Sequence, residues 1–255
     1  MKKKADVVIV GTGVAGLFSA LNLPDDKEII MITKSDAESS DSFLAQGGIC
    51  VLRDEEDYDS YFEDTMRAGH YENRKESVDI MIRSSGKIIE DLVGYGVEFE
   101  KDGEAFAYTR EGAHSRPRIL FHADVTGKEI TSKLLARVRE KNNVTIYEYT
   151  TMTDILEENG KCAGITVKTQ SGEESSIYAD YTILASGGIG GLYQHSTNFP
   201  HLTGDALEVA KKHHIRLEHL DYVQIHPTTL YSEKPGRRFL ISESVRGEGA
   251  LLYNK

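Results

Sequence analysis

The sequence predicts an α/β protein built on a parallel sheet, and three observations support this fold class. An apolar strand at residues 7–10 runs into a glycine-rich turn at residues 11–16, and an apolar helix follows. A second buried strand at residues 28–33 completes a strand–turn–helix–strand unit within about 30 residues. Strands and helices mix over the rest of the chain, with an antiparallel layer inserted among them.

The first half of the chain continues with helices. The first helix starts at Val14 and is stopped by Pro24, and residues 34–48, rich in Ser, Asp and Gly, are expected to form a loop. The acidic run at residues 54–59 is expected to open a solvated surface helix that continues through Met66, because carboxylates favour the positive end of a helix.

Two more helices are predicted before the strands resume. Thr126 and Glu129 have the spacing of a capping box, which predicts a helix that continues through Val138. A longer helix is expected at residues 76–95. Its apolar face would carry Val78, Met81, Ile82, Ile88, Ile89 and Leu92.

The middle of the chain alternates as strands. The dipeptide Asn159-Gly160 is typical of a hairpin turn. A glycine-rich segment at residues 186–191 follows the last strand, and a helix starts near Thr203. The expected strands cover residues 144–149, 153–156, 163–167 and 181–185.

Composition and charge exclude several classes of function. The 255 residues carry a net charge of −11, which argues against nucleic acid or an anionic membrane surface as the main partner. No apolar run approaches the roughly 18 residues that span a bilayer, and residues 7–10 are too short for the core of a secretory signal. Cys50 and Cys162 have no metal-type spacing, so we expect two free thiols, no metal site and a cytoplasmic protein.

The glycine motif predicts a dinucleotide site. Gly11 would make the tight turn, Gly13 would let a pyrophosphate approach the backbone, and Gly16 would allow the helix to pack closely on the strand. An NAD site favours an acidic residue about 20 residues further on. Here the second strand ends at Lys34, which is compatible with the 2′-phosphate of NADP or with a surface lysine. The residues alone do not identify which dinucleotide binds.

Four ordered motifs carry a resemblance. They are DSFLAQGG at residues 41–48, ASGG at 185–188, QIHPT at 224–228 and ESVRGEGA at 243–250. Together they resemble the succinate dehydrogenase and fumarate reductase flavoprotein family, and within it the branch of the aspartate oxidases. The resemblance covers essentially the whole chain. It implies a Rossmann-type FAD-binding domain with an inserted antiparallel β layer at residues 1–220, and the beginning of an α+β capping domain at residues 221–255.

The same resemblance implies the FAD contacts. Lys34 would lie near the adenosine ribose, Thr151 and Met152 near the adenine, and residues 41–48 along the flavin. Asp205 would match a flavin-side aspartate, although its spacing equally suits an ordinary helix cap. The implied contacts are Gly11, Gly13, Val14, Ala15, Gly16, Lys34, Asp41, Ser42, Phe43, Leu44, Ala45, Gln46, Gly47, Gly48, Thr151, Met152 and Asp205.

One position separates branches of the family. The respiratory dehydrogenases carry a histidine five residues before the glutamine of AQGG, and that histidine bonds covalently to FAD. This sequence has Asp41 there. The resemblance therefore implies noncovalent FAD and a protein outside the membrane-bound respiratory complexes.

The substrate residues also follow from the resemblance. An α-amino dicarboxylate needs donors for two carboxylates and one anion for its ammonium. Glu111, in TREGAHS at residues 109–115, matches the residue that recognises the substrate amino group, and His226 matches a substrate-binding histidine. Ser242 and Glu243 would be the other residues of the substrate site. From the residues alone, Glu111 is part of a polar loop, a lone histidine is usually structural, and Glu243 suits a salt-bridged helix start.

The implied activity is FAD-dependent oxidation of L-aspartate to iminoaspartate, with oxygen or fumarate as the acceptor. In the family, iminoaspartate feeds quinolinate synthase on the route to NAD. Family members continue well past residue 255, so we expect an N-terminal part that is inactive by itself. Two alternatives stay open, namely a soluble fumarate reductase-like flavoprotein and a noncatalytic FAD-binding fragment.

Overall fold

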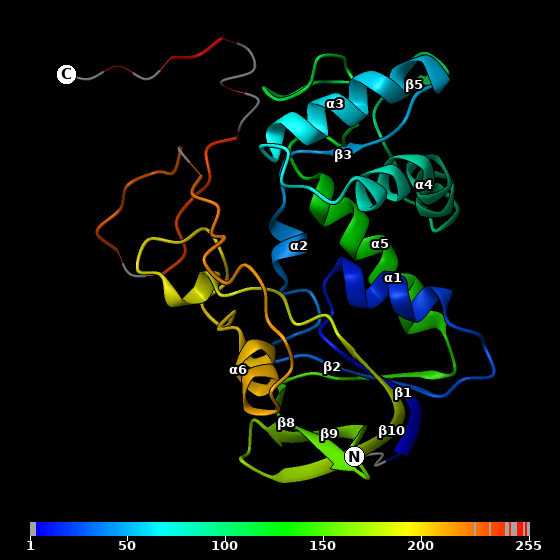
Figure 1. The fold of residues 1–255 in the computed structure, drawn as a ribbon, viewed down its shortest axis with the longest axis vertical. Coiled ribbons are helices and arrows are strands. Elements are labelled where there is room, and N and C mark those ends of the chain that lie inside the picture. Colours follow the sequence, from blue (N-terminus) through cyan, green and yellow to red (C-terminus); the bar gives the residue numbers. More distant parts are fainter. Residues whose placement is uncertain are drawn as a thin grey trace. The chain divides into compact units, whose positions relative to one another are not determined.

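The chain divides into two compact units. The structure, a computed structural model, describes residues 4–226, 228–234, 236–242, 245, 249–251 and 253. The first unit comprises Met1–Leu44 and Leu134–Leu240, and the second Ala45–Lys133 and Ile241–Lys255 (Figure 1). These units are not the segments 1–220 and 221–255 expected from the sequence. The functional boundary at residue 220 stays a prediction.

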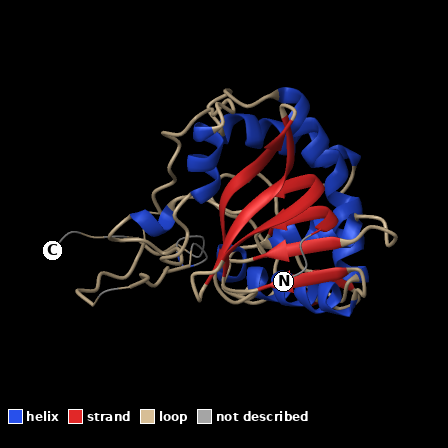
Figure 2. Cartoon of the chain, turned by 90° about the horizontal axis from the view of Figure 1, so that it is seen from below, coloured by secondary structure: helices blue, strands red, loops and turns tan. Residues whose placement is uncertain are grey.

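The first unit is organised by one six-stranded sheet, which confirms the α/β class with an inserted antiparallel layer (Figure 2). Four neighbouring strands are parallel, and the last two continue the sheet in antiparallel pairing. In sheet order the strands are β7 (Val144–Tyr147), β2 (Ile29–Ile32), β1 (Lys4–Val10), β10 (Glu174–Leu184), β9 (Lys161–Thr169) and β8 (Thr150–Glu158).

Strand β10 joins the two parts of the sheet. Its first half pairs antiparallel with β9, and its second half pairs parallel with β1. The sequence predicted only the second half, as residues 181–185. The hairpin between β8 and β9 turns at Asn159 and Gly160, as expected, and both residues have positive φ (53° and 73°).

Alternate residues of the strands form the core of the first unit, because successive side chains point to opposite faces of a sheet. One face packs against helix α6 (Asp205–Lys212), which contributes Ala206 and Val209. The other face carries Ile9, and helix α1 (Val14–Asn22) lies against β1 there, with Leu17 fully buried. The buried strand residues that form one apolar cluster with these two side chains of α6 are Ala5, Val8, Val10, Ile30, Ile32, Met152, Ile165, Val167, Ile177 and Ala179.

The second unit is mainly helical. Helix α3 (Tyr58–Ala68) packs on α4 (Lys75–Gly94) through Tyr61, Met66, Val78 and Ile82. The short strands of the second unit form two pairs. Strand β3 (Ile49–Cys50) pairs with β6 (Ile119–Leu120), and β4 (Lys101–Asp102) pairs with β5 (Ala105–Phe106). Helix α5 (Thr126–Glu140) starts in this unit and ends in the first. The remaining elements are α2 (Asp41–Leu44), η1 (Glu55–Asp57) and η2 (Gly190–Leu192).

Three local expectations are wrong. Residues 34–48 are not all loop, since α2 forms one turn there. Met81 was expected on the buried face of α4 but is 46% exposed. The capping box at the start of α5 does not form, because Thr126 Oγ1 accepts from the His122 N–H (2.9 Å) and Glu129 Oε1 accepts from the Glu98 N–H (3.0 Å).

Other expectations are confirmed. The predicted helix at residues 76–95 is α4, within one residue at each end. Cys50 and Cys162 are free thiols. Within the described ranges, no helix has the length and apolar character to cross a membrane.

The sheet core gives a direct test of stability. Ile165 is fully buried, so replacing it by Ala removes buried methyl groups and leaves a cavity, which we expect to lower the free energy of unfolding by about 2–5 kcal/mol. Ile80→Ala is the matched control, because Ile80 is 60% exposed and should change it by less than about 0.5 kcal/mol. Urea unfolding followed by circular dichroism measures both, and equal losses would contradict the assigned core.

Candidate functional site

The glycine turn has the geometry that a phosphate site needs. Gly11 has φ +113°, and a Cβ there would lie 2.2 Å from the carbonyl oxygen of Ala185. A Cβ at Gly16 would lie 2.1 Å from the carbonyl oxygen of Gly11, so α1 packs directly on the turn. Gly13 caps α1 without any side-chain hydrogen bond, and the first turn has no acidic residue. The positive end of α1 can therefore receive an anion.

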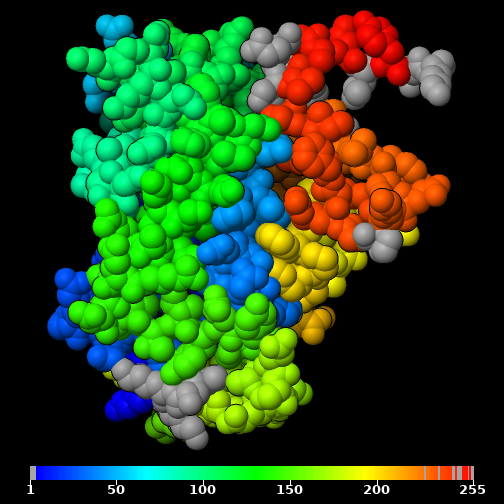
Figure 3. Space-filling model, turned by 180° about the vertical axis from the view of Figure 1, so that it is seen from behind, coloured from blue at the N-terminus to red at the C-terminus, as the bar shows by residue number. Residues whose placement is uncertain are grey.

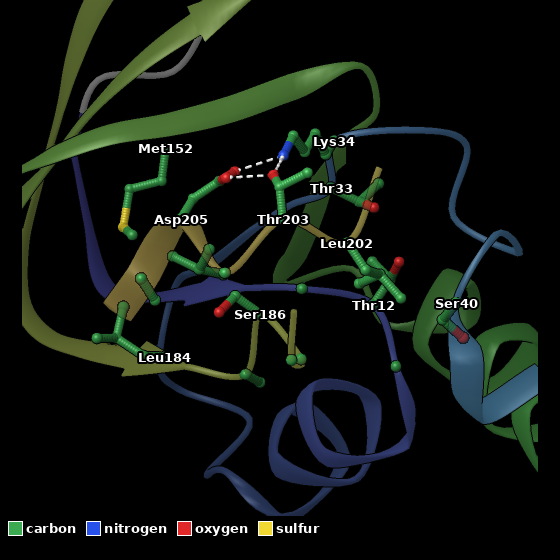
Figure 4. Close-up of a pocket in the computed structure, with 18 of the residues that line it drawn as sticks. Thr12, Thr33, Lys34, Ser40, Met152, Leu184, Ser186, Leu202, Thr203 and Asp205 are labelled. Atoms are coloured by element: carbon green, nitrogen blue, oxygen red, sulfur yellow. Dashed lines mark hydrogen bonds and ion pairs between the residues drawn. The ribbon is translucent and has the colours of Figure 1, made fainter. Parts of the chain in front are cut away.

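A cavity of about 560 Å³ opens at this turn within the first unit (Figure 4). Its size is within the range of small-molecule and cofactor sites. Apolar lining comes from Val10, Ile32, Met152 and Leu184. Of the predicted FAD contacts, those that line it are Gly11, Gly13, Val14, Ala15, Lys34, Asp41, Ser42, Thr151, Met152 and Asp205.

Lys34 and Asp205 meet in this cavity. Lys34 Nζ lies 2.7 Å from Asp205 Oδ2 and donates to Thr203 Oγ1 (2.6 Å), which itself donates to Asp205 Oδ1 (2.7 Å) (Figure 4). Lys34 also donates to the carbonyl oxygen of His201 (2.9 Å). An extended dinucleotide keeps its adenosine and its second ring far apart. The ion pair favours a shared position for Lys34 and Asp205, whereas the sequence assigned Lys34 to the ribose and Asp205 to the flavin side; both assignments stay predictions.

The sequence singled out both members of this ion pair, but not the two other groups that accept from Lys34, the Thr203 hydroxyl and the His201 carbonyl oxygen. Thr203 was noted only as part of a helix start, and His201 was not noted. The sequence feature that could have indicated the Thr203 contact is the triplet Thr203-Gly204-Asp205. In it Gly204 has φ +72° and turns the chain into α6.

Asp41 is engaged with the protein itself. Its Oδ1 accepts from the backbone N–H of Phe199 (3.0 Å), and its Oδ2 accepts from the side-chain amide of Asn198. The segment that carries Asp41 (blue) and the segment that carries Asn198 (yellow) lie side by side on the surface (Figure 3). Ser42, the next residue, accepts from the N–H of Val14 at 3.1 Å. Asp41 and Ser42 thus connect α2 to the walls of the cavity.

In the second unit, two motifs that are far apart in the sequence lie together. A Cβ on Gly47 would lie 2.9 Å from Glu111 Oε1, so the Glu111 carboxylate lies directly against this glycine. A Cβ on Gly48 would lie 2.2 Å from Ile119 Cγ2. Ala45, Gln46, Gly47 and Gly48 share a unit with Glu111, and Gly48 is needed for close packing, because a Cβ there would also lie 2.3 Å from the carbonyl oxygen of Leu120.

The other substrate candidates are placed separately. Ser242, in the second unit, donates to Asp124 Oδ1 (2.8 Å). His226 belongs to the first unit, where its Nδ1 accepts from the N–H of Thr228 (3.2 Å). Glu243 lies outside the described residues. Phe43 and Leu44 do not line the 560 Å³ cavity.

A buried ion-pair network in the second unit was missed. Arg118 is fully buried and donates to Asp57 (2.9 and 3.1 Å) and to Asp64 (2.7 Å). Most of the acidic run at residues 54–59 is exposed, as expected, but Asp57 is buried. Asp64, further along the helix, is buried as well, because both carboxylates accept hydrogen bonds from this guanidinium. The i, i+3, i+7 spacing of Asp57, Ser60 and Asp64 places them on one helix face, which is the signal the sequence offered.

The comparisons with known proteins identify the family. Residues 6–255 match the family model described as FAD binding domain. The chain belongs to the FAD binding domain family. The first unit fits this cofactor, because its glycine turn, helix end and cavity suit a pyrophosphate and an adenosine.

Similar proteins confirm the resemblance seen in the sequence. The chain is 48% identical to L-aspartate oxidase from Clostridium perfringens and 43% identical to that from Clostridium acetobutylicum, and both alignments cover the whole chain. It spans 58% and 59% of these relatives' lengths. Among solved structures, Escherichia coli quinol fumarate reductase is 27% identical, with a TM-score of 0.90 over 100% of this chain and 44% of that one.

Asp64 makes the stability of the fold depend on pH. Burial raises its pKa, but hydrogen bonds from Ser115 and Arg118 outweigh burial and lower the pKa to about 2, below the ordinary value of 3.8. A carboxyl with a depressed folded-state pKa stabilises the fold above its unfolded pKa. That contribution is lost as the pH falls from about 4 to about 2.

We therefore expect Asp64→Asn to flatten the stability profile at low pH. Urea unfolding at intervals from about pH 7 to pH 2 should show a smaller acid-dependent loss for this variant than for the parent. Asp26→Asn, at a side chain that is 76% exposed, is the control and should keep the parental profile. A parental profile for Asp64→Asn would contradict the assignment.

Proposed function

We propose that the protein takes part in FAD-dependent oxidation of L-aspartate to iminoaspartate, with oxygen or fumarate as the acceptor. The observation that carries this proposal is the Glu111 carboxylate against Gly47. The Glu111 carboxylate, beside Gly47 and Gly48, suits a substrate that bears an ammonium group. Alignment of the whole chain with relatives named L-aspartate oxidase supports the same activity.

In this proposal the first unit binds FAD by its adenosine diphosphate half. Bound FAD supplies the two-electron acceptor of the reaction. The turn at Gly11, Gly13 and the start of α1 receives the pyrophosphate, as the positive helix end without an acidic residue in its first turn suggests. Lys34 and Asp205 face the ribose, and Thr151 and Met152 face the adenine.

The remaining residues would serve the flavin and the substrate. The segment at residues 41–48 lies along the flavin, and Glu111 pairs with the substrate ammonium. His226 would donate a hydrogen bond to a substrate carboxylate, and the Ser242 hydroxyl would exchange its bond to Asp124 Oδ1 for one to the substrate. Glu243 is assigned to the same site from the sequence alone. Together these groups would orient the substrate, which contributes to rate by fixing the reacting geometry.

The proposed product indicates a place in metabolism. Iminoaspartate would pass to quinolinate synthase and so contribute to NAD biosynthesis. A soluble fumarate reductase-like protein is the second candidate, favoured by the fold shared with quinol fumarate reductase. The higher identity to the aspartate oxidases and the carboxylate at Glu111 favour aspartate.

FAD should be held noncovalently, because Asp41 bonds to Asn198 and Phe199 and occupies the position of the flavin-linked histidine. We expect acid precipitation of the FAD-loaded protein to leave the yellow colour in the supernatant. Absorbance at 450 nm in supernatant and pellet measures this. Flavin that remains with the denatured pellet would disprove noncovalent binding.

Glu111→Gln tests the substrate. The change keeps the side-chain shape and removes the charge, and a charge-assisted hydrogen bond contributes about 1.5–3 kcal/mol. In an active enzyme that contains this sequence, kcat/KM for L-aspartate should fall roughly 10- to 150-fold. Fumarate has no ammonium, so its reduction should stay within a few-fold of the parent.

The matched control is Glu104→Gln, at an exposed glutamate of the same unit, which should leave both activities unchanged. If Glu111→Gln lowers aspartate oxidation and fumarate reduction equally, Glu111 only supports its loop. That result would remove the main support for aspartate over a plain dicarboxylate.

A further inference from the structure

The loop that carries Glu111 is held at both ends within the second unit. At one end, Thr109 pairs with Ile119 through its N–H (3.0 Å), and its carbonyl oxygen accepts from the Arg118 N–H (3.1 Å). At the other end, Ser115 donates from its backbone N–H and its hydroxyl to Asp64 Oδ2, both at 2.7 Å. Glu111 lies between these two anchors.

Asp64 is the centre of the second anchor. Its Oδ2 accepts both hydrogen bonds from Ser115 and one from Arg118 Nη1 (2.7 Å), and its Oδ1 accepts from Arg67 Nη2 (2.7 Å). A carboxylate offers about four acceptor sites, so Asp64 is saturated. Its side chain is 5% exposed, which leaves water little access to replace these donors.

The charge of Arg118 can be compensated without Asp64. Asp57 already forms a two-pronged pair with it, through Nε to Oδ2 (3.1 Å) and Nη2 to Oδ1 (2.9 Å). Ser60 also accepts from Nη2 (2.9 Å). A second buried carboxylate is costly to desolvate, and such groups are retained in some proteins because they specify one conformation. Asp64, unlike Asp57, also accepts from Arg67 within the same helix and from Ser115 on the loop.

We propose that Asp64 is a positioning residue that fixes the loop at residues 109–118 and thereby holds the Glu111 carboxylate against Gly47. The part of this inference that concerns substrate preference rests on the proposed function. Loss of the Asp64–Ser115 contact would free the loop and lower the discrimination in favour of a substrate with an ammonium group, without removing any group that touches the substrate.

The network supplies two matched pairs of variants. Asp64→Asn and Asp57→Asn each remove one carboxylate from Arg118, but only Asp64 contacts Ser115 at the second anchor of the loop. Ser115→Ala and Ser60→Ala each remove one hydroxyl bonded to the network, but only Ser115 lies on the loop. The serine pair keeps the inference testable if the buried aspartate variants fail to fold.

Hydrogen exchange is the first readout, and it needs no activity. The peptide that covers residues 109–116 should exchange about 10-fold faster in Asp64→Asn than in Asp57→Asn, and faster in Ser115→Ala than in Ser60→Ala. Equal exchange within both pairs would overturn the positioning role. Faster exchange in the loop variants supports it.

Substrate preference is the second readout, in an active FAD-loaded enzyme that contains this sequence. The ratio of kcat/KM for L-aspartate to that for fumarate should fall at least several-fold in Asp64→Asn and Ser115→Ala and stay parental in the two controls. An unchanged ratio in the loop variants, beside a lowered ratio in Glu111→Gln, overturns the link from Asp64 to substrate choice. An unchanged ratio in Glu111→Gln itself overturns the proposed function, while the exchange data still decide the positioning role.

Discussion

The close contact between Gly11 and the end of β10 is the constraint on which the first unit depends. Parallel pairing of β1 with β10 brings the carbonyl oxygen of Ala185 to where a Cβ of residue 11 would be. Only glycine permits this approach, and its positive φ turns the chain into α1. The same turn aims the positive end of α1 at the cavity. The nucleotide site is thus a direct consequence of how the sheet is assembled.

The second unit depends on a different kind of constraint. A fully buried guanidinium, Arg118, must be compensated, and it gathers Asp57 and Asp64 from η1 and α3 around the start of β6. Because β6 pairs with β3, this network also fixes the strand that follows Gly48. Packing at the glycine pair and charge compensation at Arg118 therefore reinforce each other. The loop with Glu111 leaves this scaffold and returns to it.

Local signals predicted the parts of the fold that depend on neighbours in sequence. The β1–α1–β2 unit, helix α4 and the turn at Asn159 and Gly160 follow from apolar periodicity and turn chemistry. Burial of Asp57 and Asp64 could not be predicted in this way, because their partner Arg118 is more than 50 residues away in sequence. The Lys34–Asp205 pair could not be predicted for the same reason, since its members are far apart in the sequence. The resemblance named the residues, but only the fold shows which of them meet.

The central claim is that the cavity of the first unit holds the adenosine diphosphate half of FAD. Calorimetric titration of the FAD-free protein with ADP, followed by FAD, tests it most directly. We expect ADP to bind with one site per chain, and bound ADP to weaken the subsequent binding of FAD by competition. FAD binding that is unaffected by saturating ADP would contradict the claim.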